Sequence, residues 1–398
     1  MHPSPHTFLQ LTEYATERLP RASLPDELGT LLWQHYGRQV LVEFPSPKTA
    51  EQWQLTAQGW VGIVPLSPVY TVLLQPRVPL ATLWSMIAYA AGLPELLSPS
   101  HLVGVVSLPD LYDRLAAILA ERVLVRCRRG IYHAYVAQSA RLPVVRGRVA
   151  LGPTSRTPHE PHLFCHFDEH TADVEDNQIL AWTLACILRS HHCTEPTRTL
   201  VQQALLALRP VVTLRPVSPA TCLGRSYNRL NGDYQPLHAL CHFILAHTTP
   251  VTAPGDSPML PFCIHMASLF ERFVAAWLEQ RLDRGWRLQA QERHIYDAQE
   301  NLAFTIDLVI RDTATGSVRW VLDTKYKAPA TTPAAEDIAQ VVTYAEATGA
   351  AEAILVYPTP LVRPLDAQIG RVRVRSLTFA LDTAVEEAGQ RFLAALAP

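Results

Sequence analysis

Two aspartates on neighbouring apolar segments form the part of this sequence best suited to chemistry. Asp307 lies in the apolar run Phe304–Ile310, and Asp323 lies in the run that begins at Val321. An apolar strand seldom carries a carboxylate, because burying an unpaired charge costs several kcal/mol. If the two segments are paired strands of a hairpin, their carboxylates converge. Convergent carboxylate oxygens are the ligands that Mg²⁺ or Mn²⁺ prefers, so the sequence predicts a metal site.

Lys325 follows Asp323 by two positions, and the period of two in a strand places both side chains on one face. The ammonium group could orient or help deprotonate a water molecule and stabilise charge on a phosphate under attack. The chain has only three lysines, Lys48, Lys325 and Lys327, and two of them lie in this segment. The alternative is a solvated strand edge on which Asp and Lys prevent aggregation. The apolar flank Trp320–Leu322 favours the catalytic interpretation.

The elements of the last third of the chain must position these residues. A Pro-rich segment, residues 250–261, has the composition of a linker. After it, hydrophobic periodicity predicts helix, three strands, helix and strand, and then a final strand and helix. The predicted ranges are 264–282, 287–296, 303–310, 317–326, 337–348, 353–357, 371–378 and 383–397. The polar run 311–316 suits a hairpin turn, so Asp307 and Asp323 are expected on adjacent strands.

The first two thirds of the chain are predicted to form a β-rich start and a helical middle. Apolar and aromatic patterning predicts strands at 38–44, 52–56, 60–66 and 70–75 and helices at 80–92, 110–125, 177–188 and 199–208. Residues 142–161 are expected to form loops and short strands. The sequence thus predicts an α+β multidomain protein. Its domains would be 1–105, which is β-rich, 106–250, which is mainly helical, and 251–398, which is α/β with a mixed sheet.

Composition excludes several classes of protein. The chain has 398 residues, of which 48% are hydrophobic and 18% charged, so it can bury real cores. Its net charge is −2, so any nucleic-acid contact must come from a local patch. The apolar stretches are too short to span a bilayer, and the N-terminus lacks a secretory signal pattern. The scattered cysteines show no CxxC or zinc-finger spacing and are expected to be reduced and mostly buried. We expect a cytoplasmic protein with no membrane partner.

Two further charged clusters have both a structural and a functional interpretation. The densest basic region could contact phosphate or a partner, or could form a charged helix face paired with acids. It consists of Arg122, Arg126, Arg128, Arg129, Arg141, Arg146 and Arg148. An acidic cluster could mimic a second metal site, but its place in a loop and at a helix start favours capping. It consists of Asp168, Glu169, Asp173 and Asp176.

The D…DxK arrangement resembles the PD-(D/E)xK nuclease superfamily, in a variant of its fuller pattern. Such nucleases often place an extra acidic residue on the preceding helix, where this chain has Glu271. Gln340 and Tyr344 form QxxxY on the helix after the lysine, share one helix face, and resemble the RecB-like branch. The alternatives are an exposed helix carboxylate and helix packing with a polar rim. The resemblance implies catalytic roles for Asp307, Asp323, Lys325, Gln340 and Tyr344, and metal binding by Asp307, Asp323 and Glu271.

An ordered series of shorter motifs narrows the resemblance to the McrC family. Gly59–Leu66 and Val72–Arg77 resemble its β segment, although its usual lysine after the proline is Arg77 here. The family's central signature has counterparts in three segments of this chain, Val145–Arg148, Phe167–Thr171 and Asp176–Leu180. Asp176 stands where the family usually has glutamate. The C-terminal motifs are Phe270–Glu271, Thr305–Asp307, Leu322–Lys327, Asp337–Ala345 and Leu355–Pro358.

The resemblance implies a function and a partner. McrC-type proteins are nuclease subunits of modification-dependent restriction systems and work with McrB, an AAA+ GTPase that recognises methylated DNA. This chain would then be a Mg²⁺- or Mn²⁺-dependent endonuclease for double-stranded methylated DNA, with a McrB-like hexamer as partner. GTP would enter only through that partner, since the sequence contains no GxxxxGK[ST] loop. By analogy the N-terminal β-rich part inserts into the motor and stimulates it, and Arg77 is a candidate contact.

Two other functions stay open on the sequence alone. The protein could be an adaptor that activates an AAA+ motor with little nuclease chemistry, although intact D…DxK and QxxxY motifs argue against a decayed site. It could also be a stand-alone repair nuclease of the same superfamily, although the large N-terminal extension argues against that.

Overall fold

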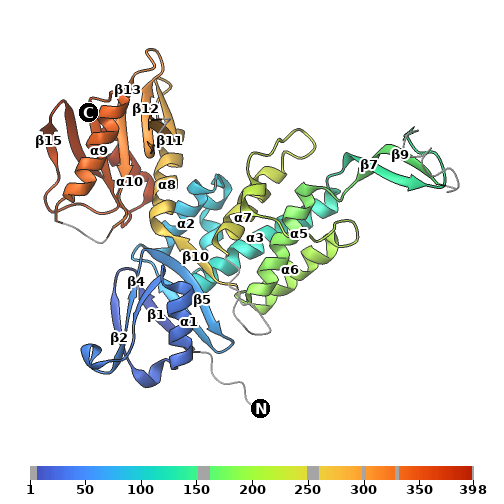
Figure 1. Cartoon of the computed structure of the whole chain (residues 1–398), viewed down its shortest axis with the longest axis horizontal. Coiled ribbons are helices and arrows are strands. Elements are labelled where there is room, and N and C mark those ends of the chain that lie inside the picture. The colour runs from blue at the N-terminus through green and yellow to red at the C-terminus, as the bar shows by residue number, and fades with distance from the viewer. Residues whose placement is uncertain (1–6, 151–161, 249–259, 298–301, 328–330, 397–398) are drawn as a thin grey trace. The chain divides into compact units, whose positions relative to one another are not determined.

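A computed structural model describes residues 7–150, 162–248, 260–297, 302–327 and 331–396 (Figure 1). The chain divides into two compact units, residues 1–111 with 249–398 and residues 112–248. No helix in the described ranges is long and apolar enough to cross a membrane. The division into three domains remains a prediction. In the structure, the first and last parts of the chain belong to the same compact unit.

Two small sheets and two helices build the start of the first unit. The sheets have the strand orders β1-β6-β5-β10 and β2-β4-β3. Leu32, Trp53, Leu55 and Leu74 are fully buried in the core that the two sheets share with the first helix. The elements are β1 (Thr7–Thr12), β2 (Thr16–Pro20), α1 (Asp26–Tyr36), β3 (Val40–Glu43), β4 (Gln52–Ala57), β5 (Trp60–Ser67), β6 (Tyr70–Gln75) and α2 (Leu80–Ala90).

Four strands and one helix of this region are confirmed within a few residues, whereas β1, β2 and α1 are absent from the sequence prediction. The buried face of α1 contains Gly29, where a Cβ would lie 2.2 Å from the ring of Trp53. Glycine weakens the helical signal of a sequence, and here it is required by the close approach of the indole.

Strand β10 (Phe262–His265) adds a segment from the last third of the chain to the N-terminal sheet. It pairs antiparallel with β5, where Cys263 lies opposite Gly62. A Cβ at Gly62 would lie 2.0 Å from the carbonyl oxygen of Phe262, so only glycine permits this pairing. The helix predicted at 264–282 is therefore wrong at its start, because strand pairing overrides its periodicity there. Helix α8 spans Met266–Arg281.

The last third of the chain forms a mixed sheet of order β11-β12-β13-β14-β16-β15. Strands β11, β12 and β13 are antiparallel neighbours, β13, β14 and β16 are parallel, and β15 runs antiparallel to β16. The elements are β11 (Trp286–Asp297), β12 (Leu302–Asp312), β13 (Val318–Thr324), α9 (Ala335–Thr348), β14 (Glu352–Tyr357), β15 (Asp366–Ile369), β16 (Val372–Thr378) and α10 (Val385–Leu396). The prediction of an α+β chain with a mixed C-terminal sheet is confirmed, and only β15 is unpredicted among these elements.

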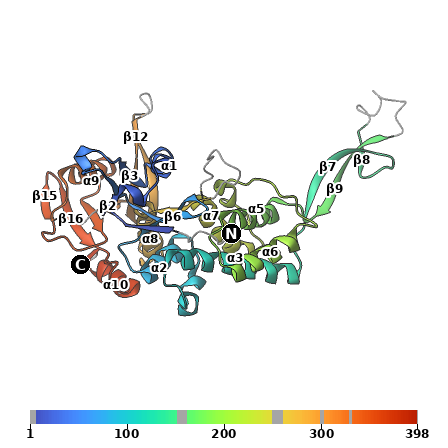
Figure 2. The same cartoon turned by 90° about the horizontal axis from the view of Figure 1, so that it is seen from below.

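Helices cover both faces of this sheet, with α9 and α10 on opposite sides (Figure 2). Val341 of α9 packs with Val309, Val321 and Leu355 in one buried cluster. On the other side, the ring of Phe379 in the loop after β16 packs between Trp277 of α8 and Phe392 of α10. Its centroid lies 5.3 Å from the centroid of each of these two rings. The sheet is thus a buried layer, which makes any carboxylate on its strands costly.

The second unit is a group of helices that carries a long β-hairpin. Its elements are α3 (Leu108–Arg129), β7 (Ala134–Leu142), β8 (Arg148–Val149), β9 (Leu163–Thr171), α5 (Glu175–Ser190), α6 (Glu195–Leu208) and α7 (Tyr234–His247). Strands β7 and β9 pair along their whole length and extend from the helices as an arm, which we call the β-arm (Figure 1). The short strands expected at 142–161 are represented by β8, and residues 151–161 lie outside the described ranges.

Asn177 ties the base of the β-arm to the helices. Its Nδ2 donates to the carbonyl oxygens of Tyr132 at 2.8 Å and Ala172 at 2.7 Å, one on each side of the arm. The hydroxyl of Tyr234 donates to Asn177 Oδ1 at 2.6 Å, and Asn177 is fully buried. Oδ2 of the neighbouring Asp176 forms an ion pair with Arg225 Nη2 at 2.8 Å. These contacts favour the structural interpretation of this acidic segment.

We predict that Asn177→Ala destabilises the second unit. The carbonyl groups of Tyr132 and Ala172 would lose their donor and the Tyr234 hydroxyl would lose its acceptor, at a cost on the order of 2–4 kcal/mol. The melting temperature should fall, and limited proteolysis should become faster within the β-arm. The exposed Gln138→Ala on the same arm serves as the control and should leave both unchanged. Equal behaviour of the two variants would contradict this role for Asn177.

Candidate active site

Strands β12 and β13 bring Asp307 and Asp323 together. The register pairs Leu308 with Leu322, so Asp307 and Asp323 come next, opposite each other. Asp307 Oδ2 accepts hydrogen bonds from the N–H of Thr324 at 2.8 Å and from its hydroxyl at 2.9 Å. Asp323 is only 2% exposed. The predicted hairpin is therefore the element that makes the two carboxylates converge.

Glu271 of α8 belongs to the same acidic group. Burial raises the pKa of Glu271 to about 7, and the charges of Asp307 and Asp323 add to the rise. Burial also raises the pKa of Asp323 to about 6, with a contribution from Asp307 that pairing with Lys325 partly offsets. Like charges away from water disfavour ionisation. Glu271 is thus not an ordinary solvated helix carboxylate but one member of a mutually repelling set of three.

This acidic group fits a Mg²⁺ or Mn²⁺ ion in chemistry and in charge. Asp323 Oδ2 is buried, and within the described ranges no donor reaches it at a hydrogen-bonding angle, although Lys325 Nζ lies 2.6 Å away. No closed set of three Asp, Glu, His or Cys ligands is formed by the described residues. Because Mg²⁺ keeps several waters, one or two carboxylates suffice to hold it. Water would supply the remaining ligands.

Lys325 lies at the centre of a polar network beside Asp323. Its Nζ lies 2.6 Å from Asp323 Oδ2 and 3.4 Å from Asp337 Oδ1, and it donates to Gln340 Oε1 at 2.9 Å. Burial by itself lowers the pKa of Lys325, but the pairs with Asp323 and Asp337 outweigh burial and leave the pKa raised. The amine is therefore protonated near neutral pH. The geometry favours stabilisation of negative charge over removal of a proton from water.

Gln340 and Tyr344 form the next layer behind the lysine. Gln340 Nε2 donates to the hydroxyl of Tyr344 at 2.6 Å, which fixes the amide so that its oxygen faces Lys325. The Tyr344 ring stacks on Phe304 of β12, with ring centroids 4.9 Å apart and an interplanar angle of 21°. Tyr344 thus packs against the sheet, and Gln340 orients the lysine amine. Hydrogen bonds and an ion pair connect both residues to Lys325 and Asp323.

Most of the chain matches one known protein family. The family model of the McrBC 5-methylcytosine restriction system component matches residues 55–358. The chain belongs to this McrBC family. The resemblance drawn from the sequence motifs is thereby confirmed, and every residue of the acidic group lies inside the matched range.

Individual McrBC proteins show the same relation. The type IV methyl-directed restriction enzyme EcoKMcrBC of Escherichia coli strain K12 is 24% identical over 218 residues, 52% of this chain and 61% of that relative. A chain of the tetradecameric assembly of Thermococcus gammatolerans McrB AAA+ hexamers with bound McrC matches with a TM-score of 0.59 and 17% identity, over 98% of this chain and 100% of that chain. A chain of the Thermococcus gammatolerans McrBC complex gives a TM-score of 0.45 and 17% identity, over 70% of this chain and 89% of that chain. The first of these structures shows a shared fold.

Two acidic-site neighbours in this McrBC-family chain lie outside the predicted set. Asp337 of α9 is 3% exposed and pairs with Lys327 at 2.7 Å as well as with Lys325. Asp337 is the first residue of the motif Asp337–Ala345, so the sequence does carry a signal for this residue. Burial raises the pKa of Tyr357 to about 12, and the charges of Asp337 and Asp323 add to the rise. The hydroxyl of Tyr357 therefore faces the same acidic region.

Gln291 of β11 is a third neighbour that the sequence does not indicate. The register of β11 and β12 places it opposite Asp307, and its amide donates to Glu271 Oε1. Its φ of 51° lies in the left-handed region, which is uncommon for a residue other than glycine. A strained backbone next to polar groups is typical of functional sites. Only the strand register reveals this residue, because a glutamine in a strand gives no signal by type.

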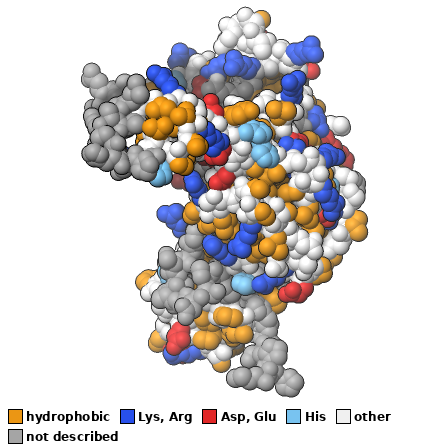
Figure 3. Space-filling view, turned by 90° about the vertical axis from the view of Figure 1, so that its right-hand side faces the viewer, with side chains coloured by type: hydrophobic (Ala, Val, Ile, Leu, Met, Phe, Trp, Pro, Cys, Tyr) orange, Lys and Arg blue, Asp and Glu red, His pale blue; other side chains and the backbone are white. Residues whose placement is uncertain are grey.

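The arginines of the predicted basic region are in part committed to internal contacts. Arg126 Nε lies 3.5 Å from Asp233 Oδ2, and its guanidinium lies over the ring of Tyr234. Arg146 lies 4.1 Å from the centroid of the Phe167 ring and 3.5 Å from Glu169. On the face shown in Figure 3, basic side chains occur in several separate groups among acidic and neutral ones. These contacts favour a paired, charged surface for this region.

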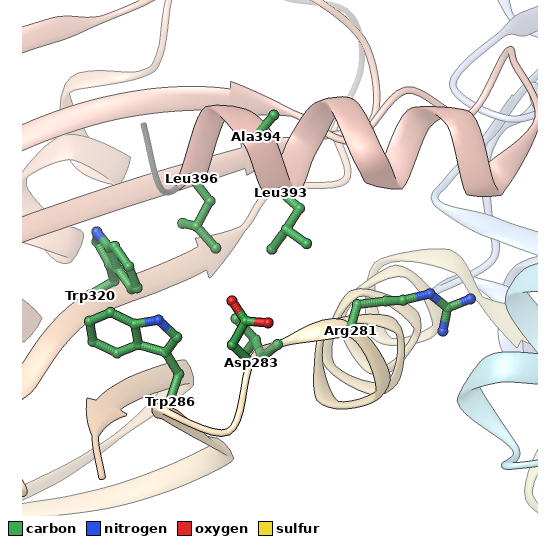
Figure 4. A pocket seen from close by; sticks show the side chains of 8 residues that line it. Arg281, Asp283, Trp286, Trp320, Leu393, Ala394 and Leu396 are labelled. Atoms are coloured by element: carbon green, nitrogen blue, oxygen red, sulfur yellow. The ribbon is translucent and has the colours of Figure 1, made fainter. Parts of the chain in front are cut away.

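A cavity of about 340 Å³ shares no lining residue with the acidic group (Figure 4). Its walls include Trp286 and Trp320, whose ring centroids are 4.7 Å apart, and Leu393 and Leu396 of α10. None of the residues predicted to act in catalysis lines it. Arg281 and Asp283 complete a lining that is otherwise mainly apolar, and the cavity contributes no group to the candidate active site.

We predict that Glu271→Gln stabilises the metal-free protein at alkaline pH. The pKa of Glu271 is raised from 4.5 to about 7 in the folded state, so its ionisation costs stability as the pH rises through this interval. Glutamine cannot ionise, so the melting temperature at pH 8 in EDTA should rise, on the order of 2 °C, with a smaller rise at pH 5.

The control for this measurement is Glu279→Gln at an exposed position of the same helix, which should change the melting temperature little at either pH. Added Mg²⁺ should stabilise the unmodified protein more than Glu271→Gln. A melting-temperature difference that does not depend on pH would contradict the assignment of Glu271 to the acidic group.

Proposed function

We propose that this chain is the nuclease subunit of a McrBC-type, modification-dependent restriction system and acts as a Mg²⁺- or Mn²⁺-dependent DNA endonuclease. The observation that carries the proposal is the convergence of Asp307, Asp323 and Lys325 on the β12–β13 hairpin of a McrBC-family chain. The order of α8, β11, β12, β13, α9 and β14 supports a PD-(D/E)xK nuclease domain, because it is the αβββαβ order that accompanies the D…DxK pattern in the sequence.

In the proposed reaction, carboxylate oxygens of Asp307, Asp323 and Glu271 would hold the cation. When bound, Mg²⁺ would polarise the scissile phosphate and make a water molecule more acidic. Lys325 donates to the phosphate oxygens as negative charge develops on them, and its raised pKa keeps it charged for this task. Gln340 holds the lysine amine in place, and Tyr344 holds the amide of Gln340. The reaction is phosphodiester hydrolysis.

The proposed partner is a McrB-like AAA+ GTPase hexamer, and the proposed substrate is double-stranded methylated DNA. Two findings support the partner: the family match, and the fold shared with a chain from an assembly of McrB AAA+ hexamers with bound McrC. GTP would act through the partner alone. Residues 1–105 are proposed to contact it, but Arg77 donates to the Lys327 carbonyl within the chain and is therefore a poor candidate for that contact.

The two alternatives receive less support from the structure. An adaptor with no nuclease chemistry has no need of a largely desolvated acidic group whose members repel one another, since such a group lowers stability. A stand-alone nuclease would not need a partner, whereas the fold is shared over 98% of this chain with a protein found in an assembly. Both remain distinguishable by experiment.

We predict that Asp323→Ala and Lys325→Met each reduce DNA cleavage on the order of 100-fold or more, because each removes a charge next to the scissile phosphate. Stimulation of GTP hydrolysis by the partner should stay within about twofold, since the acidic group is not the proposed partner contact. The assay uses methylated and unmethylated plasmid with Mg²⁺, GTP and the neighbouring AAA+ gene product. Glu346→Gln, at the surface of α9, is the matched control and should cleave normally.

The outcomes separate the three functions. Cleavage of methylated DNA that requires the partner, GTP and Asp323 supports the proposal. Stimulated GTP hydrolysis without cleavage under Mg²⁺ or Mn²⁺ would overturn the nuclease assignment in favour of the adaptor. Cleavage by the chain alone, independent of methylation, would instead identify a stand-alone nuclease.

A further inference from the structure

Three residues at one edge of the N-terminal sheet contact the segment that directly follows Lys325. Glu13 and Tyr14 come after β1, and Arg77 comes after β6. Strands β1 and β6 are parallel neighbours, so the residues that follow them emerge at the same edge. We call Glu13, Tyr14 and Arg77 the clamp.

The clamp holds both residues after Lys325 by hydrogen bonds. The hydroxyl of Tyr326 donates to Glu13 Oε2 at 3.0 Å, and the hydroxyl of Tyr14 donates to the Tyr326 carbonyl at 3.1 Å. Arg77 Nη2 donates to the Lys327 carbonyl at 2.9 Å. The same Glu13 Oε2 accepts from the N–H of Arg77 at 3.1 Å. One side chain and two carbonyl groups of Tyr326–Lys327 are thus fixed by the N-terminal sheet.

The clamp is a costly arrangement that packing alone does not require. Glu13 is 1% exposed, and Tyr326 is 4% exposed. Burial raises the pKa of Glu13, while its bonds to Arg77 and Tyr326 act in the opposite direction. The guanidinium of Arg77 lies 4.8 Å from the centroid of the Tyr14 ring. Well-packed apolar side chains would fill this space at no electrostatic cost, so the polar contacts point to a need for exact position.

The backbone of the clamp is itself constrained. Tyr14 has a φ of 58°, which is a steric outlier for a bulky residue. Its N–H donates to Ala57 of the second N-terminal sheet at 3.0 Å, and the N–H of Glu13 donates to Gln75 of β6 at 3.0 Å. Both sheets therefore hold the strained turn in place.

Gly59 makes room for the Tyr14 hydroxyl, because a Cβ at Gly59 would lie 2.4 Å from that oxygen. The backbone carbonyl of Gly59 also accepts from the N–H of Met266, the first residue of α8, at 3.0 Å. A methyl group at this position would displace the hydroxyl without changing any clamp side chain.

The N-terminal sheet reaches the acidic group by a second route. Strand β10 belongs to that sheet and leads directly into α8, which carries Glu271. The ring of Phe270, next to Glu271, lies 5.8 Å from the ring of Tyr326. The same sheet therefore supports both the end of the β13 segment and the helix that faces it. A small shift of either would change the distances among the three carboxylates and Lys325.

We propose that Glu13, Tyr14 and Arg77 are positioning residues of the nuclease site, which hold the Asp323–Lys325 segment in the geometry that binds the cation and cleaves DNA. This inference rests on the proposed nuclease function. It means that the N-terminal sheet is a working part of the active site and not only a surface for a partner. A displacement on the order of 1 Å at reacting groups can lower a rate 100-fold, which sets the size of the expected effect.

The test compares full-length variants in which the clamp is weakened in different ways. Arg77→Met removes the bond to the Lys327 carbonyl, and Glu13→Leu removes the acceptor of the Tyr326 hydroxyl. Gly59→Ala displaces the Tyr14 hydroxyl. Glu13→Gln retains an acceptor oxygen and serves as the conservative rescue.

Two readouts are independent of cleavage. Mn²⁺ binding is measured by electron paramagnetic resonance, and amide hydrogen exchange is measured for the peptide that spans residues 323–327. Cleavage then gives kcat and KM for DNA, with the partner present. Val42→Ala, in the buried core of the same N-terminal part, lowers stability without touching the clamp and controls for a purely structural effect.

The clamp is supported if Arg77→Met, Glu13→Leu and Gly59→Ala weaken Mn²⁺ binding about tenfold and lower kcat ten- to 100-fold with little change in KM, while Glu13→Gln and Val42→Ala retain near-normal values. It is overturned if Arg77→Met and Val42→Ala, at equal melting temperature, bind Mn²⁺ and cleave alike. If the unmodified protein binds Mn²⁺ through Asp323 but cleaves no DNA, the proposed function fails. The Mn²⁺ affinities of the clamp variants then still decide the positioning role.

Discussion

The repulsion among carboxylates that lie partly or fully out of water is the constraint on which this structure depends. Asp307, Asp323 and Glu271 lie together, and the charge of Asp307 raises the cost of ionising both Glu271 and Asp323, while the charge of Asp323 adds to the cost for Glu271. The surrounding structure offsets that cost with specific groups, among them the backbone N–H of Thr324 and the amine of Lys325. A protein that holds such a group gives up stability in exchange for a site that a cation completes, a known compromise between stability and activity.

The rest of the fold can be understood as successive supports for that acidic group. The β12–β13 register sets which carboxylates face each other, α9 orients the lysine through Gln340 and Tyr344, and the N-terminal sheet fixes the chain just beyond Lys325. This layered arrangement is how proteins hold reactive groups to within a fraction of an ångström.

The sequence predicted the acidic hairpin well and its supports poorly, for physical reasons. Asp307 and Asp323 stand out because charge in an apolar strand is costly, and local periodicity locates their strands without any knowledge of distant contacts. Glu13 and Gln291 carry no such signal, since their importance comes from strand register and from contact with residues far away in the chain. Likewise, the start of α8 was misplaced because pairing of β10 with β5 is a long-range contact that overrides local preference.

The pairing of β10 with β5 also has a consequence for the order in which the molecule forms. Strand β5 ends at Ser67 and β10 begins at Phe262, so roughly 200 residues are synthesised while that edge of β5 has no partner. At about 5–20 residues per second, the interval is on the order of 10–40 s, long enough for an open strand edge to pair wrongly. The second unit, residues 112–248, can fold during this interval. The acidic group, whose residues lie between 271 and 323, can thus assemble only after the second unit and β10 have been synthesised.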